Sequence, residues 1–275
     1  MDNDFKNIVS TDWLEEHLEA PDIRIIDSSW YFPHEKRNAE QEFMKSHIPG
    51  ACFFDIDKIK DDETDLPHML PPSEKFNSTV RKLGVGDGHK VVIYDGFGMR
   101  SAARLWWMFK VFGFSDVVVL DGGFPKWVKE DRLITAELAA KEIRHLTIYE
   151  DKSLVADSDD VLRATKLNHC SIIDARSEGR FLGKDPEPRS GLRSGSIESS
   201  INVPYETLLN DDFTFKKKEE ILDIFSQKGV VFNNYIITTC GSGVTAAVLY
   251  LALDEIGCTK ISLYDGSWAE WGKIK

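Results

Sequence analysis

Residues 235–253 read Tyr-Ile-Ile-Thr-Thr-Cys-Gly-Ser-Gly-Val-Thr-Ala-Ala-Val-Leu-Tyr-Leu-Ala-Leu, and the rest of the fold can be worked out from this stretch. The β-branched run 235–239 predicts a buried strand, and the apolar run 246–256 predicts a helix. Between them, two glycines allow the chain to turn sharply beside Cys240. A strand that turns directly into a helix is the building unit of an α/β fold.

The turn is predicted to surround Cys240 with backbone N–H groups. Amides of the loop and of the helix N-terminus would point at the sulfur, and their positive potential favours a thiolate over a thiol. The residues expected to form this binding loop are Gly241, Gly243, Val244 and Thr245. A single cysteine at a strand end is more often a small buried apolar residue. The two glycines favour a nucleophile here, because glycine is kept where close approach or a positive φ is needed.

The loop by itself is compatible with more than one chemistry. A cysteine phosphatase would carry an arginine at the sixth position after the cysteine, and this chain has Ala246 there. Without a guanidinium to hold a phosphate dianion, phosphatase activity is disfavoured. A persulfide carries one negative charge, which backbone amides can hold, so sulfur transfer fits the loop better.

Composition narrows the class of protein and its partners. With 275 residues, two domains are the default expectation, and 42% hydrophobic with 29% charged residues is ordinary for a soluble enzyme. A formal net charge of -12 argues against nucleic acid or an anionic membrane as the main partner. Residues 1–5 lack a basic flank and an apolar run, and no stretch is long enough to span a bilayer. We therefore expect a cytoplasmic protein.

Four cysteines occur, at positions 52, 170, 240 and 258, and none forms a Cys-x-x-Cys pair. We therefore expect no metal site. Cys52, Cys170 and Cys258 lie among apolar or small residues and are predicted to be buried. A free Cys240 implies a reducing compartment.

An internal repeat organises the chain. Four segments of the first half recur in the same order in the second half, at an offset near 145 residues. The matched pairs are 25–27 with 172–174, 47–54 with 196–204, 92–98 with 237–243, and 120–127 with 264–271. The two halves differ chemically, because Asp95 stands where the second half has Cys240. The first half therefore cannot perform thiolate chemistry at that loop.

Strand and helix patterns alternate within each half. The predicted strands are 23–27, 91–94, 117–120, 171–174, 235–239 and 261–263, and the clearest helices are 12–18, 102–112 and 246–256. Short apolar strands separated by helices indicate a parallel sheet covered on both faces. We expect two α/β domains, residues 1–140 and 155–275, joined by a connection near 134–155.

At this point the chain resembles the tandem rhodanese-like sulfurtransferases, and within that family the branch that acts on 3-mercaptopyruvate. The resemblance covers nearly the whole chain and rests on the loop 240–245, on Asp-Gly-x-x-x-x-Trp at 121 and 265, and on His-Ile-Pro-Gly at 47. It implies two rhodanese-like domains, each a parallel sheet flanked by helices, of which only the second is catalytic. The neutral pair Gly241 and Ser242 is similar to the mercaptopyruvate branch, since thiosulfate enzymes of the family carry basic residues there.

The resemblance also implies roles for particular residues. Cys240 would accept sulfur from 3-mercaptopyruvate as a persulfide and release pyruvate, without a metal or an organic cofactor. Arg180 and Arg189 fall on the arginines that bind the substrate carboxylate. Ser242, His68 and Asp57 match the family's proton-transfer group. The sulfur would pass to a thiol such as thioredoxin or glutathione, or to cyanide.

Two alternatives remain open. A thiosulfate sulfurtransferase is the nearest, although the neutral loop disfavours binding of the thiosulfate dianion. A sulfur carrier or partner-binding module without catalytic activity belongs to a different class. The combination of Cys240 with Arg180 and Arg189 argues against the second alternative.

Overall fold

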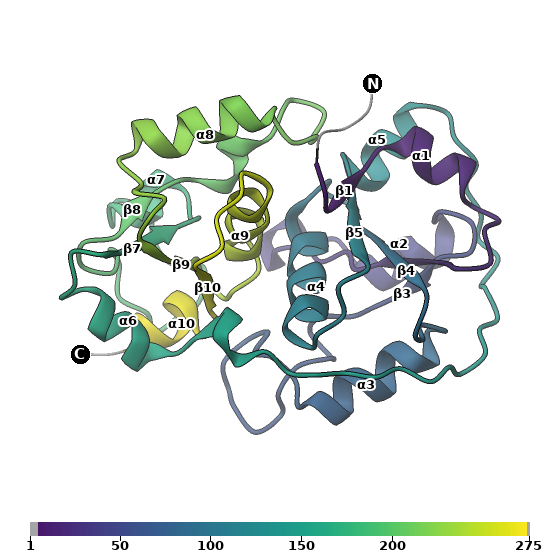
Figure 1. Ribbon diagram of the computed structural model, residues 1–275, viewed down its shortest axis with the longest axis horizontal. Helices are drawn as coiled ribbons and strands as arrows, with labels where there is room; N and C mark the ends of the chain where they lie inside the picture. Colours follow the sequence, from purple (N-terminus) through teal and green to yellow (C-terminus); the bar gives the residue numbers. More distant parts are fainter. Residues whose placement is uncertain (1–4, 274–275) are drawn as a thin grey trace. The chain divides into compact units, whose positions relative to one another are not determined.

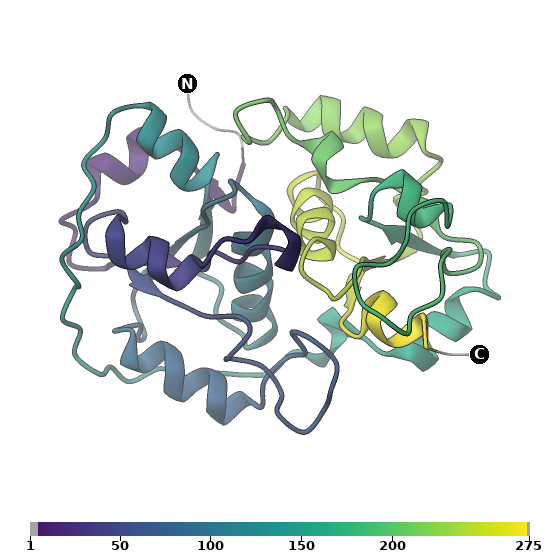
Figure 2. The same cartoon turned by 180° about the vertical axis from the view of Figure 1, so that it is seen from behind.

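The strands of this protein pair in parallel, as their short apolar runs predict. We describe residues 5–273 of a computed structural model of the chain. Its two five-stranded sheets have the orders β1-β5-β4-β2-β3 and β6-β10-β9-β7-β8, which is one topology used twice. Figure 1 and Figure 2 show the two sheets from opposite sides, each flanked by helices. The internal repeat in the sequence is therefore a structural repeat.

The chain divides into two compact units. Unit 1 holds the described residues up to Lys60 together with 71–150 and 210–215, and unit 2 holds 61–70, 151–209 and the described residues from Lys216 onward. The sequence predicts contiguous domains, 1–140 and 155–275. In the structure, residues 61–70 belong to unit 2 and residues 210–215 belong to unit 1. Each of these short segments packs with the half of the chain to which it is not adjacent in sequence.

Unit 1 contains the first five strands and helices. The strands are β1 (Ile8–Val9), β2 (Ile23–Asp27), β3 (Cys52–Phe53), β4 (Lys90–Tyr94) and β5 (Val117–Leu120). The helices are α1 (Thr11–Glu16), α2 (Ala39–Lys45), α3 (Ser73–Lys82), α4 (Arg100–Val111) and α5 (Gly123–Lys129), with a 3-10 turn at Pro33–Glu35. Its core includes Leu14, Ile25, Tyr94 and Trp127.

Unit 2 repeats this arrangement. The strands are β6 (Val155–Ala156), β7 (Cys170–Asp174), β8 (Ile201–Asn202), β9 (Tyr235–Thr239) and β10 (Ile261–Tyr264). The helices are α6 (Ser158–Ala164), α7 (Glu178–Phe181), α8 (Lys218–Gln227), α9 (Ala246–Glu255) and α10 (Ser267–Trp271), with 3-10 turns at Lys152–Leu154 and Tyr205–Leu208. Among the described residues, no helix is long and apolar enough to cross a membrane.

The predicted strands and helices are confirmed to within two residues at each end. The sequence patterns missed the two-residue strands β1, β3, β6 and β8, which extend or close the sheets. Two residues cannot display a periodic apolar pattern, so these strands are recognised only by their pairing, such as Ile26 with Cys52.

An aspartate ends the matching strand in each unit, and the two differ in their partners. The Asp174 carboxylate of β7 accepts hydrogen bonds from Nε and Nη2 of Arg176. In unit 1 the residue that matches Arg176 is Ser29, and its N–H donates to the Asp27 carboxylate at 2.8 Å. Burial without a cation raises the pKa of Asp27 to about 7, against the hydrogen bonds from Ser29 that lower it.

This raised pKa predicts a pH-dependent loss of stability. The folded state holds the Asp27 proton up to about pH 7, whereas the unfolded chain releases it near 3.8. The free energy of unfolding should therefore fall by roughly 2 kcal/mol as the pH rises from 5 to 8, and Asp27→Asn should remove that fall. Urea unfolding at several pH values measures it.

The exposed Asp223→Asn provides the control, because it makes the same chemical change on the surface. Its unfolding free energy should follow the wild-type pH profile. If the Asp27→Asn profile also runs parallel to the wild type, Asp27 does not titrate in this range.

Candidate active site

Cys240 follows the last residue of β9, the strand between β7 and β10, so it lies at the carboxyl edge of the sheet of unit 2. Ligands of α/β proteins usually bind at this edge. The cysteine is 2% exposed, and the next turn of chain runs through Gly243, with φ 77°, into α9. The local structure is the strand, glycine turn and helix that the sequence predicts.

The carbonyl groups of the loop are held on one side by α10. The N–H of Trp268 donates to the Cys240 oxygen, and the N–H of Ala269 donates to the Gly241 oxygen, both at 2.9 Å. In a planar trans peptide the N–H of the following residue points the opposite way. The N–H groups of Gly241 and Ser242 therefore point away from α10.

Several amides of the loop have no acceptor in the described part of the chain. Within residues 5–273, we find no hydrogen-bond partner for the backbone N–H groups of Gly241, Ser242, Val244 and Thr245. Four such groups in one short turn, at the start of a helix, form a binding site for an anion. These are the loop residues that the sequence assigned to the site, together with Gly243, whose positive φ shapes the turn.

Unit 1 contains the same turn, and there the anion is a carboxylate of the turn itself. The Asp95 carboxylate accepts four backbone N–H groups, from Phe97 at 2.9 Å, Gly98 at 2.6 Å, Ser101 at 2.7 Å and Ala102 at 2.8 Å. Asp95 occupies the position of Cys240 in the repeat. The matching turn of unit 2 carries a sulfur in place of this carboxylate, and its amides at Gly241, Ser242, Val244 and Thr245 have no acceptor among the described residues.

Ser267, the first residue of α10, ties the ends of the cysteine loop together. Its hydroxyl accepts the N–H groups of Cys240 at 3.2 Å and Gly243 at 3.1 Å and donates to the Tyr264 carbonyl at 2.8 Å. The residue is fully buried and has φ 48°, a left-handed conformation that disfavours a side chain. The matched residue in unit 1 is Gly123, with φ 55°.

Ser242, His68 and Arg189 come together in unit 2. The Ser242 hydroxyl lies 3.0 Å from Nδ1 of His68, and Nη2 of Arg189 donates to the Ser242 oxygen at 3.3 Å. His68 is 4% exposed, although its aspartate- and proline-rich surroundings in sequence are typical of a surface loop. Its segment is anchored by a hydrogen bond from the Leu70 N–H to Asp265 at 2.7 Å.

Asp57 belongs to unit 1, whereas Ser242 and His68 belong to unit 2. Its carboxylate accepts the indole N–H of Trp30 at 3.1 Å. The two residues help to line a pocket of about 280 Å³ that also contains Arg37 and Lys58. The assignment of Asp57 to a proton relay stays a prediction.

Arg180 lies against the cysteine loop. A Cβ atom added to Gly241 would lie 3.0 Å from Nη2 of Arg180, so the guanidinium packs directly against the loop. Glu187 accepts hydrogen bonds from both Arg180, at 2.6 Å, and the fully buried Arg176, at 2.8 Å. Burial lowers the pKa of Arg176, but Asp174 and Glu187 outweigh it and raise that pKa, so Arg176 is a permanent structural cation.

The remaining cysteines are poor nucleophiles. Burial raises the pKa of Cys52 and of Cys170, and burial together with Asp254 raises the pKa of Cys258 to about 11. The prediction that all three are buried is correct for Cys258 only. Cys52 and Cys170 are half-buried, because each begins a strand and strand ends are less covered than strand centres.

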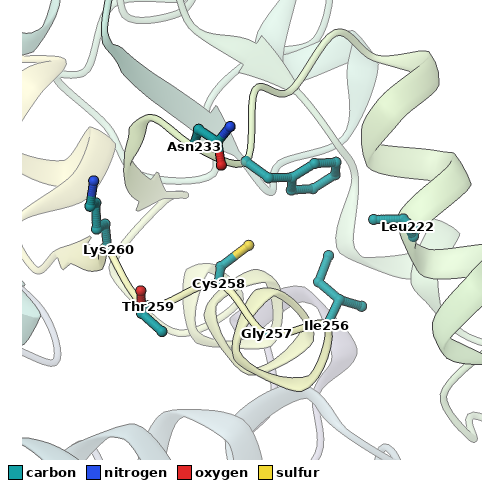
Figure 3. Close-up of a pocket in the computed structure, with 8 residues that line it drawn as sticks. Leu222, Asn233, Ile256, Gly257, Cys258, Thr259 and Lys260 are labelled. Carbon is teal, nitrogen blue, oxygen red and sulfur yellow. The ribbon is translucent and has the colours of Figure 1, made fainter.

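A pocket of about 400 Å³ lies beside Cys258, before the first residues of β9 and β10. Figure 3 shows the Cys258 sulfur directed into it, beside Leu222 and Ile256. This is the sheet edge opposite to Cys240, and its thiol stays protonated at neutral pH. The pocket therefore does not belong to the candidate active site.

Sequence reasoning missed Ser267 and Glu187. The signal for Ser267 is the difference between Asp-Gly-Gly at 121 and Asp-Gly-Ser at 265 in otherwise matching segments. Glu187 lies between Arg180 and Arg189, and the alternation of charges was its only signal.

Comparison with known proteins agrees with this geometry. The family model for the rhodanese-like domain matches residues 10–130 and again 157–274. The 3-mercaptopyruvate sulfurtransferase of Escherichia coli K12 is 41% identical over 96% of this chain and 94% of its own length. A crystal structure of E. coli SseA, described as a 3-mercaptopyruvate sulfotransferase, superimposes with a TM-score of 0.87 at 39% identity, over 96% and 99% of the two chains. Thiosulfate sulfurtransferase of Rattus norvegicus is 39% identical over 97% of this chain and 92% of its own length.

The chain therefore belongs to the rhodanese-like family and carries two copies of its domain. Within that family it is a sulfurtransferase, an enzyme that moves sulfur between small molecules or thiols. Overall identity does not distinguish the donor, since relatives named for either donor are about equally similar.

The contacts of Ser267 predict the effect of removing its hydroxyl. Ser267→Ala leaves the buried N–H groups of Cys240 and Gly243 without an acceptor and should lower the free energy of unfolding by about 1–3 kcal/mol. Urea unfolding measures the change. Ser262→Ala is the matched control, because Ser262 is equally buried and its hydroxyl has no partner among the described residues. Equal unfolding free energies for the two variants would contradict this role of Ser267.

Proposed function

We propose that this enzyme takes sulfur from 3-mercaptopyruvate as a persulfide on Cys240, releases pyruvate and passes the sulfur to a thiol or to cyanide. The observation that carries the proposal is the pair of matching turns. One turn holds the Asp95 carboxylate on four amides, and the other has Cys240 beside four amides that have no acceptor within residues 5–273.

The proposed donor carries one negative charge, on a carboxylate that the keto carbon separates from the sulfur-bearing carbon. A 2-oxo acid places a carboxylate and a keto oxygen where Arg180 and Arg189 can donate hydrogen bonds to them. Arg180 lies on Gly241, and Arg189 contacts Ser242, so both arginines border the cysteine loop. The loop itself carries no charged side chain between 240 and 245.

The first half-reaction breaks the carbon–sulfur bond of the donor. The Cys240 thiolate attacks the donor sulfur, and the bonding electron pair leaves with carbon as the enolate of pyruvate. The proton of the donor thiol ends on that carbon, which gives pyruvate and an anionic persulfide. The amides of Gly241, Ser242, Val244 and Thr245 stabilise the negative charge on sulfur throughout.

A proton must move during this step, and the proposed route uses Ser242 and His68, with Asp57 as the third member. The Ser242 hydroxyl contacts both His68 and Arg189, so it links the histidine to the substrate-binding arginine. A positioned hydroxyl and imidazole can carry the proton to the enolate carbon.

In the second half-reaction an acceptor thiolate attacks the outer sulfur and regenerates the Cys240 thiolate. Thioredoxin, glutathione and cyanide are suitable acceptors, because each supplies a soft nucleophile that can attack the outer sulfur. A reducing compartment such as the cytoplasm keeps Cys240 available for this cycle.

The two sulfur donors differ in whether the leaving group must be protonated. Thiosulfate releases sulfite, which leaves as an anion without a proton, whereas the pyruvate enolate needs one. Ser242→Ala should lower kcat/KM for 3-mercaptopyruvate about tenfold and change thiosulfate turnover less than threefold. Initial rates with both donors, using the wild type and the variant, measure the effect.

The wild type should prefer 3-mercaptopyruvate, and Cys240→Ser should be inactive with both donors. Cys258→Ser should keep wild-type rates. A wild type that prefers thiosulfate would replace this proposal by a thiosulfate sulfurtransferase, and activity in Cys240→Ser would rule out the persulfide.

A further inference from the structure

Glu187 is a buried carboxylate shared by two arginines. Its side chain is 2% exposed, and it accepts hydrogen bonds from Arg176 at 2.8 Å and from Arg180 at 2.6 Å. Arg176 has a second carboxylate of its own, because Asp174 binds its Nε and Nη2 atoms. Glu187 is therefore the acidic partner that is left to compensate Arg180.

The contact determines which part of Arg180 faces outward. Nε and Nη2 of Arg180 both point at Glu187, at 3.4 and 2.6 Å, so that edge of the guanidinium is occupied. Within the described chain, Nη1 has no acceptor. Nη2 is also the atom of Arg180 that would lie closest to a Cβ on Gly241, so the cysteine loop faces a guanidinium whose charge is already paired.

Pairing changes how Arg180 discriminates between anions. A guanidinium paired with a carboxylate still donates a hydrogen bond, but it attracts a second negative charge only weakly. Thiosulfate carries two negative charges and mercaptopyruvate carries one. A neutral pair beside the loop therefore favours the singly charged donor.

We propose that Glu187 is a specificity residue that positions Arg180 and cancels its charge beside the Cys240 loop, so that the enzyme selects a singly charged 2-oxo acid over a doubly charged donor. The inference rests on the proposed sulfur transfer through Cys240 and names the feature that sets its donor preference. Glu187 reaches the substrate only through Arg180, so it is a positioning residue and not a catalytic one.

Two substitutions separate charge from shape. Glu187→Gln keeps the size of the side chain and removes its charge, whereas Glu187→Asp keeps the charge and shortens the side chain. The readout is the ratio of kcat/KM for 3-mercaptopyruvate to kcat/KM for thiosulfate. Glu178→Gln is the matched control, because Glu178 is an exposed residue of α7, the helix that carries Arg180, and its neutralisation changes the net charge equally.

Glu187→Gln should lower this ratio about tenfold at low salt, by raising thiosulfate turnover relative to mercaptopyruvate turnover. Added salt should shrink the difference, because the effect is electrostatic. Glu187→Asp and Glu178→Gln should keep the ratio within threefold of the wild type. Thermal unfolding of each variant reports whether unit 2 remains folded.

Equal shifts in Glu187→Gln and Glu187→Asp would overturn the proposal, since shape and not charge would then control the ratio. An unchanged ratio in Glu187→Gln, or a loss of activity that only accompanies unfolding, would overturn it as well. The proposed function is tested separately by the wild-type ratio. A wild type that prefers thiosulfate would refute that function, while the shift between wild type and Glu187→Gln would still test Glu187.

Discussion

The structure of this protein depends on one interaction, an anion held by backbone N–H groups where a strand turns into a helix. Such groups at a helix start need an acceptor, and a negative charge is the strongest one available. In unit 1 the acceptor is the Asp95 carboxylate, which belongs to the turn itself. In unit 2 the same turn carries Cys240, and the proposed function uses the amides around it to hold a negative charge on sulfur.

The surroundings of the turn maintain this arrangement in unit 2. Trp268 and Ala269 bind the loop carbonyl groups, and Ser267 binds the amides at the two ends of the loop. The amides between those ends are thereby directed away from α10. Arg180, which lies against the loop, is held by the Glu187 carboxylate, so the loop of unit 2 is bordered by a paired cation.

Much of this arrangement could be predicted from the sequence, because the repeat places equivalent turns in both halves. The match of 92–98 with 237–243 identified Asp95 as the counterpart of Cys240, and apolar runs located the long strands. The contacts of Ser242 with His68 and Arg189 agree with roles implied by family resemblance. Neither periodicity nor spacing would have selected a histidine so far away in sequence.

Other features could not be predicted, for physical reasons. Glu187 and Ser267 act through burial and hydrogen bonding, and neither property is visible in a single sequence. The membership of 61–70 in unit 2 depends on packing between segments distant along the chain. The two-residue strands, such as β3, are too short for any periodic pattern.

The most direct test of the account is to mix the enzyme with one equivalent of 3-mercaptopyruvate in the absence of an acceptor, and to measure pyruvate and the mass of each cysteine peptide. We predict one pyruvate per chain and one added sulfur atom on the peptide of Cys240, which cyanide then removes. Sulfur on Cys52, Cys170 or Cys258, or pyruvate released without sulfur bound at Cys240, would contradict the account.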